Sequence, residues 1–291
     1  MTQSILKYAA VAFGVMAFFT ITAIPVQALP LSLTASDQGF VTETGGTDKF
    51  DGTISPATGN YSVGYELACP AGGLCGGGFI PLQRKNYFVF DSLASVGSPI
   101  TAATLKLFNP AGGYENGPGD PTETFAIGAT DPGLVTGVLS KIADIGTVVG
   151  PGDVTAPLIA TAVALFAELG ESLGPIVGSL PPPGITVIAD ATVSAADDGT
   201  VVDVVFNAEG IAYLNTIAGL GLELVLGGAL LTSDPLSGVP QSMFGFSSSL
   251  TSPAPELVLE LAEITIPAPG GAAMLMLGIF LMGPWRGRTR R

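Results

Sequence analysis

Two stretches decide the fold: Arg84–Asp91, which reads RKNYFVFD, and Ile100–Phe108, which reads ITAATLKLF. The first contains the predicted strand Asn86–Asp91, which is apolar at consecutive positions, so both of its faces are expected to be buried and it is expected to lie centrally in a sheet. The second alternates, with Leu105 and Leu107 predicted to point inward and Lys106 outward. Together they predict a sheet with one strand covered on both sides.

The rest of the chain is punctuated by 40 glycines and 23 prolines. About ten short strands separated by turns predict a mainly β fold, a β-sandwich or jelly roll with one or two short helices. Besides the two stretches above, strands are expected near Phe40 and at Tyr61–Leu67 (as an edge strand), Thr122–Gly128, Lys141–Val149, Ile185–Ser194, Thr200–Phe206, Leu222–Leu226, Met243–Phe246 and Leu257–Leu261.

Two segments break the strand pattern. Apolar residues recur at helical spacing in Thr155–Leu180, where Thr155 is the expected N-cap of a helix that packs on the domain or covers a sheet edge. Asn207 is expected to cap a second, shorter helix. The predicted buried faces comprise Ile159, Ala162, Val163, Phe166 and Leu169 in the first helix, and Ile211, Leu214 and Ile217 in the second.

The front of the chain has the parts of a secretory signal. Lys7 is the only charge before Asp37, and Tyr8–Ile24 is an apolar run. Small residues then lead to a predicted signal-peptidase cleavage between Ala28 and Leu29, so residues 1–28 are interpreted as a signal peptide. The alternative is a retained N-terminal membrane anchor.

The end of the chain reads as a second targeting segment. Gly270–Trp285 carries no charge, and its 16 residues would span about 24 Å as a helix, short of a hydrocarbon core of about 30 Å. Such a transmembrane helix is marginal and suits temporary anchoring. A basic stop follows it, which would hold the C-terminus in the cytoplasm; the alternative is a buried C-terminal helix. The basic residues are Arg286, Arg288, Arg290 and Arg291.

The tail, residues 266–291, resembles the PEP-CTERM sorting signal in its order of proline motif, apolar segment and basic cluster. The matching motif is Ile266, Pro267, Ala268 and Pro269, with Ala268 where the family usually has Glu. The resemblance implies an exported protein of a Gram-negative bacterium that is transiently anchored in the inner membrane. It implies that an exosortase-like enzyme removes the tail and leaves the protein at the cell surface or in the extracellular matrix.

Between the two targeting segments, residues 29–265 are interpreted as one ectodomain with a helical insertion at about 155–180. This part holds all 24 acidic residues against five basic ones, a formal charge of −19. Nucleic acid and anionic membranes would repel it, so neither is an expected partner. The five basic residues are Lys49, Arg84, Lys85, Lys106 and Lys141.

The chain contains no histidine, which excludes Ser-His-Asp and Cys-His catalysis and His-ligated zinc. Its two cysteines, Cys69 and Cys75, lie close together in a Gly-rich stretch. In an exported protein such a pair predicts a local disulfide. The alternative, a redox pair, lacks the Cys-x-x-Cys spacing.

The body also resembles the DNRLRE-type β-sandwich family, over Arg84–Leu261 with Val149–Gly184 as an insertion. The resemblance is carried by RKNYFVFD, ITAATLKLFNPAGG, DPTETFAIG, FGFSS and PELVLEL in this order. Members occur on exported and surface proteins, and some resemble modules that bind acidic polysaccharides. The family implies a binding or structural module and no catalyst, although a fold does not fix function.

Three functions are therefore weighed. The first is a structural or adhesive protein of the surface polysaccharide layer, which needs no catalytic residue. The second is a carbohydrate-binding module for extracellular polysaccharide, for which Tyr61, Tyr65 and Tyr114 are the candidate stacking residues and Arg84-Lys85 the candidate basic groove. The third is a glycoside hydrolase or lyase, which needs a carboxylate pair that nothing in the sequence singles out.

No cofactor is required by the first two functions. A Ca²⁺ site is a side hypothesis, because carboxylates and loop carbonyls are the ligands that calcium prefers. For the first cluster below, the competing interpretation is a plain Asp-Gly hairpin turn. The two clusters are Asp197-Asp198-Gly199 with Asp203, and Glu115 with Asp120 and Glu123.

Overall fold

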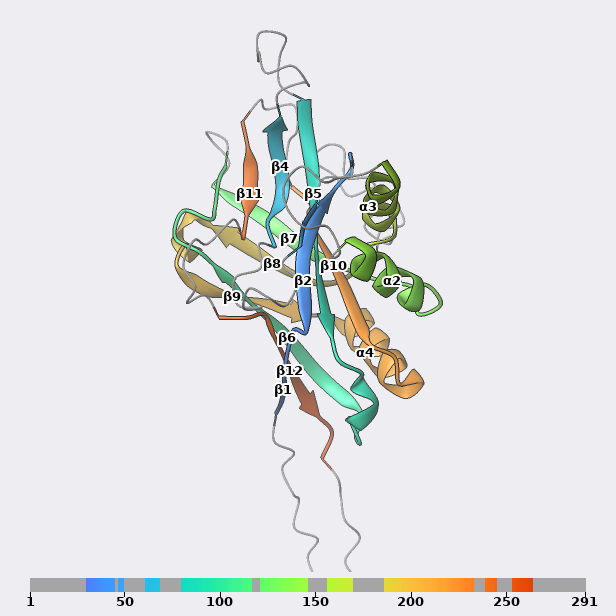
Figure 1. Cartoon of the computed structure of the whole chain (residues 1–291). Helices are drawn as coiled ribbons and strands as arrows, with labels where there is room; N and C mark the ends of the chain where they lie inside the picture. The colour runs from blue at the N-terminus through green and yellow to red at the C-terminus, as the bar shows by residue number, and fades with distance from the viewer. Residues whose placement is uncertain are drawn as a thin grey trace, which may run out of the picture. The chain divides into compact units, whose positions relative to one another are not determined.

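The computed structural model describes residues 30–44, 47–49, 61–68, 80–116, 121–145, 156–169, 186–232, 239–244 and 253–263, and Leu29–Ala262 forms one compact unit. These described ranges hold twelve strands, and every pairing between them is antiparallel (Figure 1). The strands are β1 Leu31–Thr34, β2 Asp37–Thr42, β3 Thr47–Lys49, β4 Val63–Ala68, β5 Ile80–Phe90, β6 Ile100–Asn109, β7 Thr122–Ala129, β8 Val187–Ser194, β9 Thr200–Phe206, β10 Leu224–Leu230, β11 Gln241–Met243 and β12 Glu256–Leu261.

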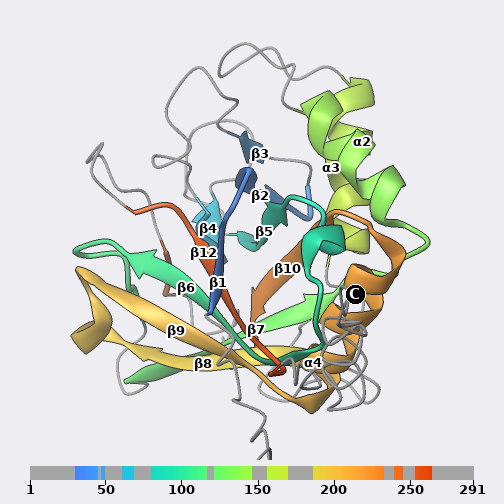
Figure 2. The same cartoon turned by 90° about the horizontal axis from the view of Figure 1, so that it is seen from below.

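The strands form one curled sheet in the order β1-β12-β6-β9-β8-β7-β10-β5-β2-β3, with β4 pairing to both β5 and β11. β8 and β9 pair through only two residue pairs, Ala189 with Phe206 and Asp190 with Val205. The sheet therefore folds over at this point into two layers, with β1, β12, β6 and β9 in one layer. The other layer holds β8, β7, β10, β5, β2 and β3 (Figure 2).

The N-terminal segment joins the two layers on the opposite side. β1 pairs with β12, and the chain then crosses directly to β2, which pairs with β5. At the crossing, the Ala35 amide donates to the Pro255 carbonyl at 2.9 Å and the Ser36 amide donates to the Val89 carbonyl at 2.8 Å. The mainly β, sandwich-like fold predicted from the sequence is thus confirmed.

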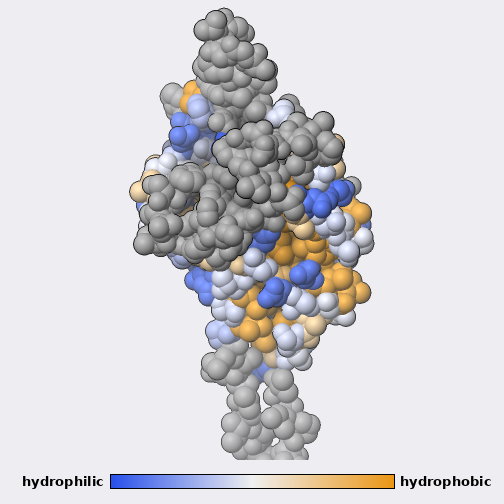
Figure 3. Space-filling view, viewed as in Figure 1, coloured by the Kyte–Doolittle hydropathy of each residue, from blue (hydrophilic) through white to orange (hydrophobic). Residues whose placement is uncertain are grey.

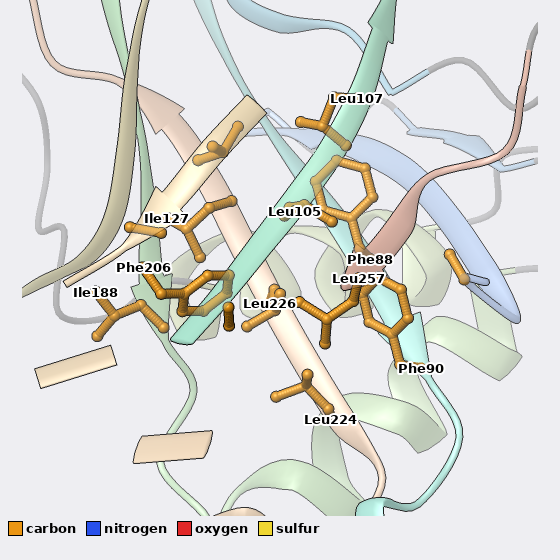
Figure 4. Close-up of a cluster of buried hydrophobic side chains, with 14 of the residues drawn as sticks. Phe88, Phe90, Leu105, Leu107, Ile127, Ile188, Phe206, Leu224, Leu226 and Leu257 are labelled. Atoms are coloured by element: carbon orange, nitrogen blue, oxygen red, sulfur yellow. The ribbon is translucent and has the colours of Figure 1, made fainter. Parts of the chain in front are cut away.

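The main core lies between the layers (Figure 4). Leu105 and Leu107 of β6 are fully buried in it, as the alternation in the sequence predicts. Val202, Val204 and Phe206 of β9 also point inward. From the other strands, the core takes Phe88, Phe90, Phe125, Ile127, Ile188, Leu224, Leu226, Leu257 and Leu259.

β5 is buried on both faces, which confirms the prediction of a central strand. Phe88 and Phe90 enter the main core, while Tyr87 and Val89 point to the opposite side. There they pack against two helices, α2 Val135–Ile145 and α3 Ala156–Glu168. This second core also contains Val41, Val135, Val138, Ile142, Ile145, Ala162, Leu165, Leu169 and Val225.

The helical prediction for the region after Thr155 is confirmed by α3, although the buried face differs: Leu165 is fully buried and Val163 is 39% exposed. The strand predicted at Lys141–Val149 is wrong, because Lys141 lies inside α2, whose buried residues recur at helical spacing. The described ranges hold three α-helices, more than the one or two expected. The edge position predicted for Tyr61–Leu67 is also wrong, since β4 is flanked by β5 and β11.

The third helix, α4 Ala208–Leu220, follows β9 directly and packs on the end of the sandwich. As predicted, Asn207 caps it: its side-chain oxygen accepts a hydrogen bond from the Gly210 amide at 2.9 Å. Gly210 has to be glycine, because a Cβ there would lie 2.1 Å from the Ile188 carbonyl oxygen. Leu214 and Ile217 are buried, whereas Ile211 is only partly buried. Two 3-10 turns, η4 Leu93–Ser95 and η6 Ala195–Asp197, complete the described elements.

Candidate interaction face

The predicted targeting residues and the cysteine pair lie outside the residues that the structure describes. Within the described ranges, no helix is both long enough and apolar enough to cross a membrane. The residues outside are Ala28 and Leu29 at the signal cleavage, Ile266, Pro267, Ala268 and Pro269 of the sorting motif, Arg286, Arg288, Arg290 and Arg291 of the basic stop, and Cys69 and Cys75.

The two ends of the described chain lie on paired strands. Leu31 of β1 is the register partner of Leu259 of β12, and Ser32 is that of Val258. Beyond β12, the Ala262 amide donates to the Pro99 carbonyl at 2.7 Å. Both ends therefore leave the sandwich from the same end of one strand pair.

The three tyrosines proposed for sugar stacking do not form an exposed platform. Tyr61 and Tyr65 are each only 6% exposed, and the Tyr61 hydroxyl donates to the Phe108 carbonyl at 2.7 Å. Burial raises the pKa of Tyr61 well above its ordinary value. Tyr114 is partly buried against the main core, and its hydroxyl accepts from the Asn116 side-chain amide at 2.7 Å. These tyrosines therefore take part in the packing of the sandwich.

The adjacent basic residues do not form a groove either. The Lys85 ammonium is buried beneath α3, where it donates to the carbonyls of Phe166 at 3.2 Å and Leu169 at 3.1 Å. Burial lowers the pKa of Lys85 to about 8. The Arg84 guanidinium lies 4.8 Å from the centre of the Phe40 ring. The Lys85 ammonium thus binds carbonyl groups at the C-terminal end of α3, where a positive charge is favourable.

Asp198, from the first proposed calcium cluster, holds a loop together. Its carboxylate accepts from the Asn109 side-chain amide at 2.9 Å and from the amides of Gly112 and Tyr114, each at 3.0 Å. Asn109 is fully buried, and its side-chain oxygen in turn accepts from the Phe244 amide at 2.9 Å. The Asp198 carboxylate therefore anchors the turn after β6, and Gly199, with φ of +75°, completes the predicted hairpin turn.

The remaining acidic candidates are separated from one another. Asp197 caps η6 together with Ser194, and the buried Glu123 accepts from the Thr232 hydroxyl at 2.5 Å. Glu115 forms a bridge with Ser242. Asp120 lies outside the described residues. Among the residues that are described, no group of three His, Cys, Asp or Glu side chains is arranged to hold a metal ion.

The two layers of the sandwich differ on their outer sides. α2 and α3 cover β2, β5 and β10, as Figure 2 shows, whereas the outward residues of β6 and β9 include exposed hydrophobic side chains. We call this second surface the open face. Its three paired rows are Thr104 with Val205, Lys106 with Asp203, and Phe108 with Val201.

The open face mixes apolar and charged side chains. Val205 is 57% exposed and Val201 48%, high values for strand residues of this size. In the middle row, the Lys106 ammonium lies 3.7 Å from the Asp203 carboxylate, and both side chains reach solvent. On the neighbouring β12, Glu256 pairs with Lys106 in register and accepts a hydrogen bond from the Ser32 hydroxyl of β1.

Other exposed hydrophobic residues lie elsewhere. Figure 3 shows hydrophobic surface around α2 and α4, broken up by hydrophilic residues. Leu134, just before α2, is 38% exposed, and Leu220, at the end of α4, is 58% exposed. Leu220 is thus as exposed as Val205 while lying on a helix, which makes it a useful control.

No family model matches the chain, and a search of curated proteins finds no similar one. The two family resemblances therefore depend on the motifs in the sequence. Of the open-face residues, Asp203 was singled out from the sequence, as a candidate calcium ligand, whereas Val201, Val205 and Lys106 were not singled out as functional. The available signal was Thr200–Phe206, TVVDVVF, in which valines alternate onto both faces of a strand that was predicted to have one buried face.

Proposed function

We propose that the chain is an exported, exosortase-sorted protein of the cell surface or extracellular matrix, with a structural or adhesive role in the surface polysaccharide layer. The observation that carries the proposal is the pairing of β1 with β12, which brings the two ends of the sandwich together. A body attached in this way lies wholly between its two targeting segments. Removal of either segment takes away none of the described strands.

The contents of the sandwich support a binding or structural role over catalysis. The side chains that were candidates for chemistry are used in folding: Asp198 anchors a turn, Lys85 ends a helix and Tyr61 fills the core. The proposal needs no cofactor. A carbohydrate-binding role would require stacking residues other than the three tyrosines named above.

Processing of the tail tests the proposal. The full chain and a Pro267→Ala/Pro269→Ala variant are expressed in a Gram-negative host that makes the processing enzyme, and each is followed by fractionation and mass spectrometry. The wild type is expected to lose Arg291 and leave the inner membrane, while the variant keeps Arg291 and stays there.

A variant with all four terminal arginines changed to lysine is the matched control. It keeps the positive charge that orients the tail, so it is expected to be processed like the wild type. If the wild type and the proline variant are retained alike, with Arg291 present in both, the tail is a permanent anchor and the sorting proposal fails.

A further inference from the structure

The open face combines two properties that are unusual together. Its upper and lower rows expose valines, and its middle row places one positive and one negative side chain side by side. The body has only five basic residues, and three of them are engaged with other parts of the fold: Arg84 stacks on Phe40, Lys85 lies under α3, and Lys141 pairs with Glu168 at 2.6 Å. Lys106 is thus a scarce cation displayed on an outer sheet face.

This arrangement is self-complementary. Consider two copies stacked face to face, related by a two-fold axis that runs along the strands midway between β6 and β9. The axis keeps each row at its own height and places β6 of one copy over β9 of the other. Lys106 then faces the other copy's Asp203 and Phe108 faces its Val201, because each pair shares one register position.

The charges select this orientation over the other symmetrical one. A two-fold axis running across the strands would place Lys106 over the second copy's Lys106 and Asp203 over its Asp203, which is repulsive. The charged row lies between the two rows that expose valines. The rotation of about 30° that twisted sheets adopt on packing therefore leaves the central charges closest to their partners.

We propose that the open face binds a second copy of this chain, forming a two-fold dimer through β6 and β9. The exposed valines and Phe108 supply the apolar contact, and the Lys106–Asp203 row fixes the register. Contacts of this kind are isologous, and they close after two copies. The proposal goes beyond the proposed function and does not depend on whether the tail is processed.

A charge-swap experiment tests it on the full chain in a mild detergent, where any association through the tail is the same in every variant. Lys106→Asp puts two acids in the row and Asp203→Lys puts two cations there. Each variant alone is expected to dissociate at least tenfold more readily than the wild type. Mixed, the two variants face each other with opposite charges, so differently tagged copies are expected to purify together.

A second pair of variants tests the apolar part without changing charge. Val205→Thr keeps the shape of the side chain and the strand preference, and it is expected to weaken the dimer several-fold. Leu220→Gln, at a residue of equal exposure on α4, is expected to leave it unchanged. Circular dichroism establishes that each variant is folded.

Three outcomes would overturn the proposal. The wild type could sediment as a monomer at all accessible concentrations, or every pairing of the charge variants could behave alike. Alternatively, Leu220→Gln could weaken association while Val205→Thr does not, which would place the contact on the helices.

Discussion

The two outer sides of the sandwich are both formed by β-strands, but α2 and α3 cover one side and the other exposes apolar side chains. Over β2, β5 and β10, the outward residues Val41, Val89 and Val225 are buried by α2 and α3. Over β6 and β9, the outward valines Val201 and Val205 remain about half exposed. Outward valines on this sheet are therefore found both beneath helices and in contact with solvent. An apolar residue on the outer face of a strand does not by itself predict that a helix of the same chain covers it.

Polarity separates the two sides. On the covered side, the buried charge of Lys85 is satisfied by carbonyls at the end of α3. The open face keeps its charges in water, and its central pair spans 3.7 Å. We infer that the first side is committed to folding and the second is left for association. The following predictions test this division, from the largest expected effect to the smallest.

Truncating a buried side chain on the covered side should lower the free energy of unfolding the most. Leu165→Ala in α3 removes a fully buried side chain between the helix and the sheet, so the free energy of unfolding should fall by about 3 kcal/mol. Val163→Ala, two residues away on the exposed side of the same helix, should change it by less than about 0.5 kcal/mol. Urea unfolding measures both. Equal losses would show that α3 does not cover the sheet as described.

Disrupting the turn that the Asp198 carboxylate anchors should cause the second-largest loss of stability. Asp198→Ala leaves the amides of Gly112 and Tyr114 and the Asn109 side chain without their acceptor, which should destabilise the fold by about 2–3 kcal/mol. Asp203→Ala, on the open face, removes only a solvent-exposed ion pair and should cost less than about 1 kcal/mol. Thermal unfolding of the two variants makes the comparison. Reversed magnitudes would contradict it.

Lys85 should make the stability depend on pH. Its pKa is about 8 in the fold against an ordinary 10.5, so between these values the unfolded chain binds more protons than the folded one. Stability should therefore rise with pH, by about 2 kcal/mol from pH 8 to pH 10. Above pH 10 the trend should reverse, because burial also raises the pKa of Tyr61 and Tyr213, and their ionisation favours unfolding.

Lys85→Met is the control for that titration. It removes the group that titrates, so the rise between pH 8 and pH 10 should disappear even if the absolute stability changes. A wild-type profile that is flat across this window, or a variant profile with the same slope, would show that Lys85 is not buried as an ammonium beneath α3.

The open face should affect folding least. Val205→Thr keeps a β-branched side chain at a position that is 57% exposed, so the free energy of unfolding of the monomer should change by less than about 0.5 kcal/mol. Unfolding at high dilution measures the monomer. A loss comparable to that of Leu165→Ala would show that Val205 supports the fold and is not reserved for association.

Local pattern was enough to predict much of the fold. Alternation identified β6 with Leu105 and Leu107 inward, strands were also predicted where β9 and β12 lie, and the uninterrupted apolar run identified β5 as central. Pattern failed at α2, where Lys141–Val149 has strand-like composition but the residues before it extend a helical repeat. The helical repeat of buried residues in α2 can be recognised only when the sequence window starts early enough to include Val135 and Val138.

The site was harder to predict than the fold. Tyrosines at 61 and 65 were candidates for a sugar platform, but their burial depends partly on β10 and β11, which lie more than 150 residues further along the chain. The exposure of Val201 and Val205 likewise depends on where α2 and α3 pack. The sequence of Thr200–Phe206 does not indicate that the two helices cover the other layer, so the exposure of these valines could not be predicted from it.

The most direct test of the whole account is the intact mass of the protein isolated from its own host, together with the fraction in which it is found. We predict a mature chain that begins at Leu29, ends near the Ile266–Pro269 motif and lies outside the inner membrane. A chain that still carries Arg291 and remains in the inner membrane would contradict the account. The body would then be a tethered domain, and its function would have to be sought at the membrane.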